Sequence, residues 1–241
     1  MVMRFVVLTG LLVALAHGVG AQGLAPDPDR LYADRERLAS ARQAVMIWEE
    51  RLAKDPRDFE SAWKLARGCY WLGGHVPEDE RRKQFERGME AAMKAIALQP
   101  NRPEGHFWLA ADMGAMAEGF GLRQGIKYRS PIKQELETVL MIDAGYQQGS
   151  ADRALGRWYF RVPRLFGGSK DKSVEHLKKA LSYAPESTAT HYFLAETYLE
   201  MDKKDEAKRE LQTVLSAPLH PEWTPEDKEF KQKAAELLKK L

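Results

Sequence analysis

An apolar helical segment that ends at a proline-containing turn recurs along this chain. Its clearest copies are KAIALQP at residues 94–100 and KALSYAP at residues 179–185, and looser copies are TVLMIDA at 138–144 and TVLSAPL at 213–219. Proline disfavours the helical conformation of the residue that precedes it, so the proline-ended copies indicate helix ends. A segment that recurs in this way predicts repeated helical units, each of which buries its apolar face against the next.

Signals for β-structure do not accompany these segments. The sequence contains no Asn-Gly or Asp-Gly hairpin turn, and it shows no sustained alternation of apolar and polar residues. Ala, Leu, Glu, Lys and Arg are abundant and follow the period of an α-helix. Proline-containing turns at 55–56, 99–103 and 184–185 separate the helical stretches. We therefore predict an all-α chain.

The repeated unit resembles the tetratricopeptide repeat, a helix-turn-helix of about 34 residues whose first helix carries a Leu-Gly-x-x-Tyr-like signature. The stretch from Leu194 to Tyr198 matches that signature, and the stretch from Leu155 to Tyr159 matches it one repeat earlier. Longer copies join residues 65–73 to 85–100 and residues 106–116 to 131–144. The resemblance implies a superhelix (solenoid) of about four repeats, with an N-terminal half-repeat at 31–55 and a capping helix at 224–241.

Two narrower resemblances concern the middle of the chain. Residues 105–143 and 154–168 are similar to helical-repeat proteins of the regulator of microtubule dynamics family, and residues 166–180 are similar to the periplasmic T-component of TRAP transporters. The second resemblance implies an accessory subunit that binds or passes a small acidic ligand to a transporter component. The chain departs from that component because it has no lipid-anchoring cysteine near its predicted cleavage site.

The N-terminal segment predicts a secretory signal peptide. Arg4 precedes an apolar run from Phe5 to Ala16, and Val19 and Ala21 are the small residues of a cleavage site. The run is shorter than the roughly 20 residues of a membrane span, and a retained anchor is the alternative. We predict a signal peptide at 1–21, a linker at 22–30 and a helical-repeat domain at 31–241, secreted into the bacterial periplasm without membrane insertion after cleavage.

Composition argues against several functional classes. The net charge of +2 provides no general attraction for nucleic acid or an anionic membrane. Cys69 is the only cysteine, and the six histidines include no His-Glu-x-x-His pair, so neither a metal nor another cofactor is expected. The Gly-Gly-Ser-Lys run at 167–170 lacks the spacing of a phosphate loop, and we expect it to end one helix and cap the next. The chain is therefore predicted to be non-catalytic.

The resemblance to tetratricopeptide repeats implies that first-helix residues line a concave groove that binds another protein or peptide. Two insertions, around 75–82 and 118–130, are expected to be loops beside this groove. Whether residues 22–30 fill the groove, and whether the chain is a monomer or an oligomer, stay open. The candidate groove residues are Trp63, Arg67, Tyr70, Trp71, Phe107, Arg153, Arg157, Phe160, Arg161, Tyr192 and Glu196.

Arg153, Arg157 and Arg161 form the sharpest feature of that set, because their spacing places them in one stripe on a helix. Like charges at this spacing destabilise a helix by roughly 0.2 to 0.5 kcal/mol per pair, so counter-charges are expected. They come either from Glu196 and Glu200 in the next repeat or from carboxylates of a bound ligand. The second source suits a peptide partner and also the alternative function, binding of a small acidic ligand.

Overall fold

A computed structural model describes residues 26–241, so the predicted signal peptide at 1–21 lies outside the described residues. Within that part the chain forms α-helices and one short 3-10 helix, with no strand. None of these helices is both long and apolar enough to cross a membrane. The helices are α1 (Pro28–Ala33), α2 (Leu38–Lys54), α3 (Phe59–His75), α4 (Glu78–Leu98), α5 (Pro103–Gly119), α6 (Leu122–Ile142), α7 (Tyr146–Arg161), η1 (Arg164–Phe166), α8 (Lys170–Tyr183), α9 (Thr188–Leu199), α10 (Lys204–Ser216) and α11 (Thr224–Leu238).

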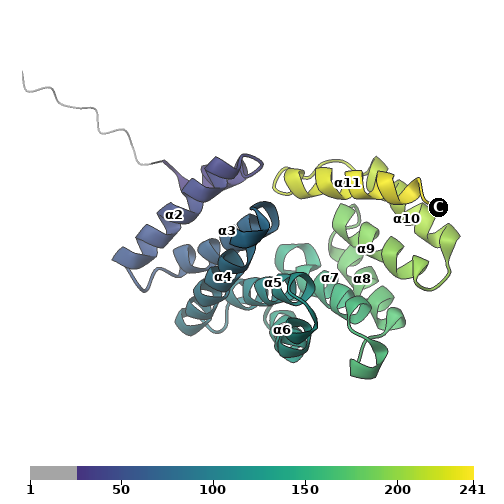
Figure 1. Ribbon diagram of the computed structural model, residues 1–241, viewed down its shortest axis with the longest axis horizontal. Coiled ribbons are helices and arrows are strands. Elements are labelled where there is room, and N and C mark those ends of the chain that lie inside the picture. The colour runs from purple at the N-terminus through teal and green to yellow at the C-terminus, as the bar shows by residue number, and fades with distance from the viewer. Residues whose placement is uncertain (1–25) are drawn as a thin grey trace, which may run out of the picture.

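Four helix pairs, α3/α4, α5/α6, α7/α8 and α9/α10, make the repeats and share the most extensive contacts. The pairs follow one another along an arc, with α4, α6 and α8 on its outer side (Figure 1). Helix α2 and the short α1 precede them as the predicted half-repeat. Helix α11 covers the last pair through Phe230, Ala234 and Leu237, as predicted for the cap. The α-α superhelix predicted from the sequence is thus confirmed.

Proline explains where three of the helices end. Helices α2, α4 and α8 end at Lys54, Leu98 and Tyr183, in each case two residues before a proline. The intervening residues Asp55, Gln99 and Ala184 have ψ angles of 96°, 79° and 81°. These angles lie outside the helical region, which the ring of a following proline disfavours.

The small residue of the repeat signature is needed for close helix packing. Gly156 on α7 lies against α8, and a Cβ at this position would be only 2.5 Å from Cγ of Leu177. Both helices contribute to the buried interior, where Leu155 and Leu177 are almost completely buried. A larger side chain at position 156 would push the two helices of this repeat apart.

Helix α1 begins within the predicted linker at 22–30. Residues 28–30 belong to α1 and not to a linker. Asp27 caps this helix by accepting a hydrogen bond of 3.0 Å from the amide of Asp29, and Pro28 occupies its first turn. An Asp-Pro pair is a favourable helix start because aspartate caps free amides and proline has a preset φ angle.

The two insertions predicted as loops are mostly helical. Helix α3 continues to His75 and α4 begins at Glu78, while only Phe120 and Gly121 separate α5 from α6. The additional residues therefore lengthen α4 and α6 to 21 residues each, compared with 14 in α8 and 13 in α10. At the start of α4, Glu78, Asp79 and Glu80 favour helix because carboxylates stabilise its N-terminal end.

The Gly-Gly-Ser-Lys run also differs in detail from its prediction. Ser169 caps α8, since its hydroxyl accepts a hydrogen bond of 3.3 Å from the amide of Lys172, as expected. However, α7 already ends at Arg161, before Val162 and Pro163. Gly167, with φ of 99°, follows the 3-10 helix and permits the left-handed turn that leads into α8.

Candidate partner-binding surface

Helix α1 covers Arg67, one of the predicted groove residues of α3. Asp29 accepts a hydrogen bond of 2.9 Å from Lys64 and lies 3.7 Å from Arg67. The Arg67 guanidinium lies 4.1 Å from the centre of the Tyr32 ring, a favourable cation–π distance. Asp29 and Tyr32 both belong to α1, so it is this helix that occupies the inner face at the first repeat.

Trp71 and Phe107 are core residues. Trp71 is 5% exposed and donates a hydrogen bond of 3.1 Å from Nε1 to the carbonyl of Arg35. Phe107 is 9% exposed and packs edge-on against Trp108 and Tyr146, with ring centroids 5.1 and 5.7 Å away. Both residues lie on the first helices of their repeats, as their positions in the repeats predict. Their side chains, however, pack inside the protein and do not line an open groove.

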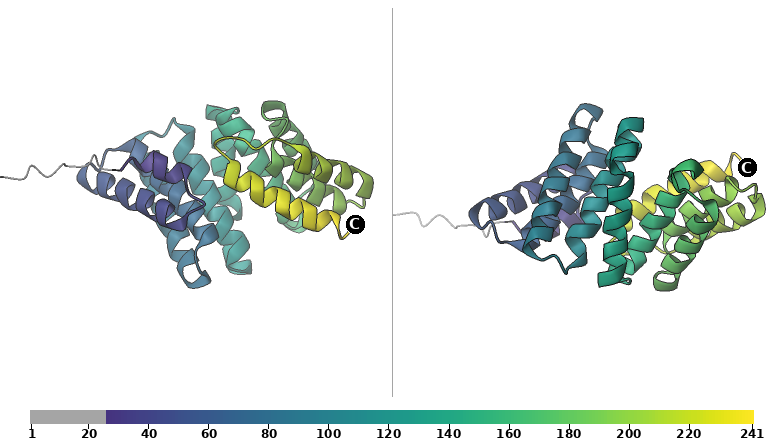
Figure 2. Two further views of the ribbon diagram at one scale, coloured as in Figure 1. Left: turned by 90° about the horizontal axis from the view of Figure 1, so that it is seen from above. Right: turned by 90° about the horizontal axis from the view of Figure 1, so that it is seen from below.

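Helix α11 lies across the inner side of the arc and reaches its N-terminal part (Figures 1 and 2). Arg35 donates to both carboxylate oxygens of Glu226, at 3.1 and 2.5 Å. Further along α11, Glu229 accepts from His75 at 2.7 Å. The C-terminal helix therefore contacts α3 and the turn after α1, as well as capping the last repeat.

The arginine stripe finds two of its counter-charges inside the protein. Arg157 contacts Glu196 of the next repeat at 2.6 Å and Glu118 of the preceding one at 3.3 Å. Burial lowers the pKa of Arg157, but these carboxylates outweigh it and hold the pKa above its usual value. Arg161 pairs with Glu118 at 3.5 Å. The expected partner of Arg161, Glu200, lies instead 3.9 Å from Lys170.

Arg153 differs from the other two arginines of the stripe. It has no ion pair or hydrogen bond with any residue in the range 26–241. Burial lowers its pKa to about 10, and Tyr70 partly opposes that effect. An arginine with such a pKa still carries its positive charge at neutral pH. The inner face therefore holds a half-buried cation next to Tyr70, whose side chain is 40% exposed.

Two further candidate residues border this cation-containing region. Phe160 lies under Lys170, whose ammonium is 3.9 Å from the ring centre. Tyr192 packs against Phe230 of α11 with ring centroids 5.5 Å apart. Both side chains are partly exposed. The structure thus brings together Tyr70, Arg153 and Arg157, while α11 adjoins the surface at Tyr192.

The histidines that share a place in their repeats have the same structural role. His106 contacts Glu135 at 2.5 Å and the carbonyl of Pro100 at 2.9 Å. His191 contacts its equivalent glutamate, Glu210, at 2.5 Å and the carbonyl of Pro185 at 2.8 Å. Each histidine thereby ties the turn before its repeat to the second helix. Across residues 26–241, no group of three or more potential ligands could hold a metal ion.

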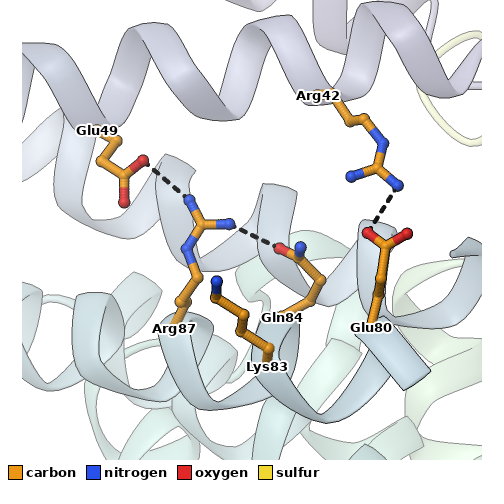
Figure 3. Close-up of a pocket in the computed structure, with 6 residues that line it drawn as sticks. All are labelled: Arg42, Glu49, Glu80, Lys83, Gln84 and Arg87. Carbon is orange, nitrogen blue, oxygen red and sulfur yellow. Dashed lines mark hydrogen bonds and ion pairs between the residues drawn. The ribbon is translucent and has the colours of Figure 1, made fainter. Parts of the chain in front are cut away.

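Sequence reasoning missed two clefts, both formed where second helices lie next to each other. One has a volume of about 500 Å³ and lies between α2 and α4 (Figure 3). Arg42 pairs with Glu80 at 2.9 Å and Arg87 pairs with Glu49 at 2.9 Å across it. These two ion pairs bridge the two helices across the cleft, and Lys83 adds a further positive charge to its lining. A second cleft lies between α4 and α6 and is mainly apolar.

Comparison with known proteins matches two parts of the chain to two families. Residues 26–166 match the family described as regulator of microtubule dynamics protein 1-3, and residues 171–237 match a tetratricopeptide repeat family. Regulator of microtubule dynamics protein 3 of Bos taurus is 25% identical over 192 residues, which are 73% of this chain. Protein 1 of Pongo abelii is 23% identical over 205 residues, or 77% of this chain. The chain spans only 40% and 63% of the lengths of these two relatives.

Solved structures agree on the fold. A thermophilic tetratricopeptide repeat protein of Thermus thermophilus superimposes with a TM-score of 0.66 at 23% identity, covering 88% of this chain and 97% of that one. MamA of Desulfovibrio magneticus RS-1, from residue 41 onward, gives a TM-score of 0.51 at 20% identity, covering 80% and 96%. These similarities show a tetratricopeptide-like fold.

Proposed function

Since the chain belongs to the family of regulator of microtubule dynamics proteins 1-3, we propose that it is a non-catalytic scaffold that binds a segment of another protein on the inner face of its superhelix. The observation that carries the proposal is Arg153, a half-buried cation without a carboxylate partner among residues 26–241, beside the exposed Tyr70. An acidic side chain of a bound segment would form a charge-assisted hydrogen bond with this guanidinium. Tyr70 and Tyr192 would contribute aromatic contact area.

The remaining polar groups support binding rather than catalysis. His106 and His191 hold turns to second helices through both ring nitrogens. Cys69 is completely buried, and burial raises the pKa of its thiol, which disfavours the reactive thiolate. The groups that most often act as bases or nucleophiles thus have packing roles in this fold.

Photo-crosslinking tests the proposal directly. A photoreactive phenylalanine analogue in place of Tyr70 should capture a protein partner in cells, and the same analogue at Met141, which is 80% exposed, serves as the control position. Replacing Arg153 with Glu should abolish the adduct at position 70. The matched change Lys178→Glu, at an exposed position of α8, should leave it intact. An adduct that survives Arg153→Glu, or one formed equally from position 141, would reject inner-face binding.

Arg153 also favours a second candidate, the binding of a small carboxylate in a transporter accessory role. Its positive charge would pair with the ligand, and the bound state would be stabilised against unfolding. Thermal unfolding with and without succinate distinguishes this function. If the chain binds small carboxylates, its melting temperature should rise with succinate concentration. This rise should be lost in Arg153→Gln and kept in Lys178→Gln. Equal responses of both variants would exclude it.

We also propose that the chain acts outside the cytoplasm, in the bacterial periplasm. The positive Arg4, the apolar run from Phe5 to Ala16 and the small residues at 19 and 21 support this location. Fusion of residues 1–30 to alkaline phosphatase, which is active only after export, provides the test in a bacterial host. Introduction of two charged residues within the run should abolish phosphatase activity, and an inactive parent fusion would contradict the proposal.

A further inference from the structure

The cleft between α4 and α6 has the features of a docking site for a helix. Its volume is about 340 Å³, and side chains of α5 form part of its lining. Figure 1 places α4 and α6 on the outer side of the arc, away from α11. We call it the methionine groove, and its apolar lining consists of Met89, Met93, Leu109, Met113, Tyr128 and Pro131.

Three methionines line this groove, two at its buried floor and one at its exposed edge. Met89 and Met113 are 9% and 5% exposed, whereas Met93 is 51% exposed. Methionine side chains are flexible and polarizable, so a surface built from them can adjust to different apolar side chains. A groove with an apolar floor can receive the apolar face of a partner helix.

Charges around the methionine groove are predominantly negative. Glu86, Glu90 and Glu135 line it, against the single basic residue Lys127. Glu90 has no ion pair among residues 26–241, and Glu86 has one at 3.9 Å with Arg82. Glu86 and Glu90 are one helical turn apart, a spacing at which like charges repel each other by roughly 0.2 to 0.5 kcal/mol. Cations on a partner would relieve this repulsion.

The two other charged residues already have partners. Glu135 contacts His106 at 2.5 Å, and Lys127 donates a hydrogen bond of 3.0 Å to the hydroxyl of Tyr128. The free negative charge therefore lies on the α4 side of the groove. A docked helix would have to carry its basic residues along that side.

The dimensions of the groove fit a short helical contact. Its lining on α4 runs from Glu86 to Met93, which corresponds to about 10 Å of helix, or two turns. Two turns of a partner helix present about three apolar side chains at positions i, i+3 and i+4. Helices α4 and α6 have 21 residues each, so both extend beyond the groove at its two ends.

We propose that the methionine groove docks an amphipathic helix of another protein, whose apolar stripe enters between α4 and α6 and whose lysine or arginine flank meets Glu86 and Glu90. The groove lies between the second helices α4 and α6, whereas Arg153 lies on the first helix α7. The groove therefore gives the scaffold a second surface, independent of its inner face.

Methionine methyl NMR on the full chain tests this proposal. The probe is an amphipathic helical peptide of about 18 residues built from leucine and lysine, and its matched control replaces each lysine with glutamate. The lysine peptide should shift the methyl signals of Met89, Met93 and Met113. Met46 and Met141, which are 57% and 80% exposed and lie outside the groove, act as internal controls. Shifts at the control methyls alone, or no shifts, overturn the proposal.

Charge reversal separates specific docking from general attraction. The double change Glu86→Lys and Glu90→Lys should weaken binding of the lysine peptide by about tenfold or more, with an unchanged helical circular dichroism spectrum. Glu186→Lys on an exposed turn provides the matched control, and Arg153→Glu should leave this affinity unchanged. Equal binding of both peptides, or full binding by the double variant, contradicts the charge assignment. Concentration-dependent shifts of the groove methyls without peptide would identify a second copy of this chain as occupant and reject the proposal.

Discussion

Arg35 and Glu226 form a two-point ion pair although 191 positions separate them in the sequence. Arg35 also donates a hydrogen bond of 2.7 Å to the carbonyl of Glu222. The arginine side chain is 3% exposed, whereas that of Glu226 is 26% exposed. This contact joins the turn after α1 to the last helix of the superhelix.

Loss of the Glu226 charge should destabilise the whole chain. In Glu226→Gln the Arg35 guanidinium stays buried without its counter-charge, and we expect a loss of about 1 to 3 kcal/mol in the free energy of unfolding. Urea unfolding followed by circular dichroism measures this change. The control is Glu36→Gln, which removes the 2.8 Å contact with Lys228. Both partners there are 51% exposed, so its cost should stay below about 1 kcal/mol. Equal costs for the two variants would contradict the structural importance of Arg35.

The contact between His75 and Glu229 should make the docking of α11 depend on pH. Burial lowers the pKa of His75, but Glu229 and the carbonyl of Trp71 outweigh it and raise the pKa above its usual value of 6.5. Hydrogen bonding to His75 in turn lowers the pKa of Glu229 below 4.5. The stabilisation that His75 provides is complete below the pKa it has in the unfolded chain. It is lost as the pH rises through the higher pKa that His75 has in the folded chain. The glutamate contribution is lost as pH falls through its own folded pKa. The contact is therefore strongest between about pH 4.5 and 6.5.

Hydrogen exchange of α11 amides measures this dependence. Exchange should accelerate beyond the intrinsic chemical rate as the pH rises above about 6.5, and His75→Gln should remove most of that acceleration. His191, in helix α9 of the last repeat, also has a raised pKa. In His75→Gln the free energy of global unfolding should therefore still depend on pH through His191. His191→Gln is the matched control, because it should reduce the global slope without changing the local response of α11. A local response that persists in His75→Gln would exclude this contact as its cause.

The repeat architecture was predictable because its signals are local. Proline constrains the residue before it, so the ends of α2, α4 and α8 followed directly from the sequence. Gly156 was recognisable from its place in the repeat signature, and its close contact with Leu177 explains the need for a small residue. Such signals act within one repeat, where residues that are close in the sequence are also close in space.

Contacts across the arc were not predictable in the same way. The position of α11 relative to Arg35 depends on the summed rotation of four repeats, and no single repeat encodes that sum. The burial of Trp71 has a similar origin, since Arg35, in the turn after α1, packs against it. The pairing of Arg161 with Glu118 also depends on the additional turns that lengthen α5 and α6. Repeat register assigns a residue to a helix face but does not determine what covers that face.

Arg157 and Glu196 should be energetically coupled. Their contact of 2.6 Å joins α7 to α9, and the side chains are 22% and 25% exposed. A double-mutant cycle with Arg157→Gln and Glu196→Gln should give a coupling energy of about 0.5 to 2 kcal/mol in chemical unfolding. The more exposed pair Arg161 and Glu118, at 3.5 Å, is the comparison and should give a smaller value. Zero coupling between Arg157 and Glu196 would argue against internal pairing of the stripe.

Asp112 should weaken the fold as pH rises. Its side chain is fully buried, faces Gly88 of α4, and neither carboxyl oxygen has a hydrogen-bond partner among residues 26–241. Burial raises its pKa well above the usual 3.8, so the folded chain keeps it protonated where the unfolded chain ionises it. Its contribution is complete below the unfolded pKa and is lost progressively as pH rises towards the folded pKa.

Replacing Asp112 with Asn removes that titration while keeping nearly the same shape. We expect Asp112→Asn to be more stable than the parent by about 1 kcal/mol or more near pH 7.5, since only the parent must keep a carboxyl protonated on folding. Near pH 3.5 the difference should shrink towards zero, because the unfolded Asp112 is then mostly protonated as well. Urea unfolding at the two pH values gives the comparison, with Glu186→Gln at an exposed turn as the control for a generic loss of negative charge. A stabilisation that is the same at both pH values would show that it comes from packing, and a destabilised variant at pH 7.5 would mean that the Asp112 carboxyl has a partner in solution.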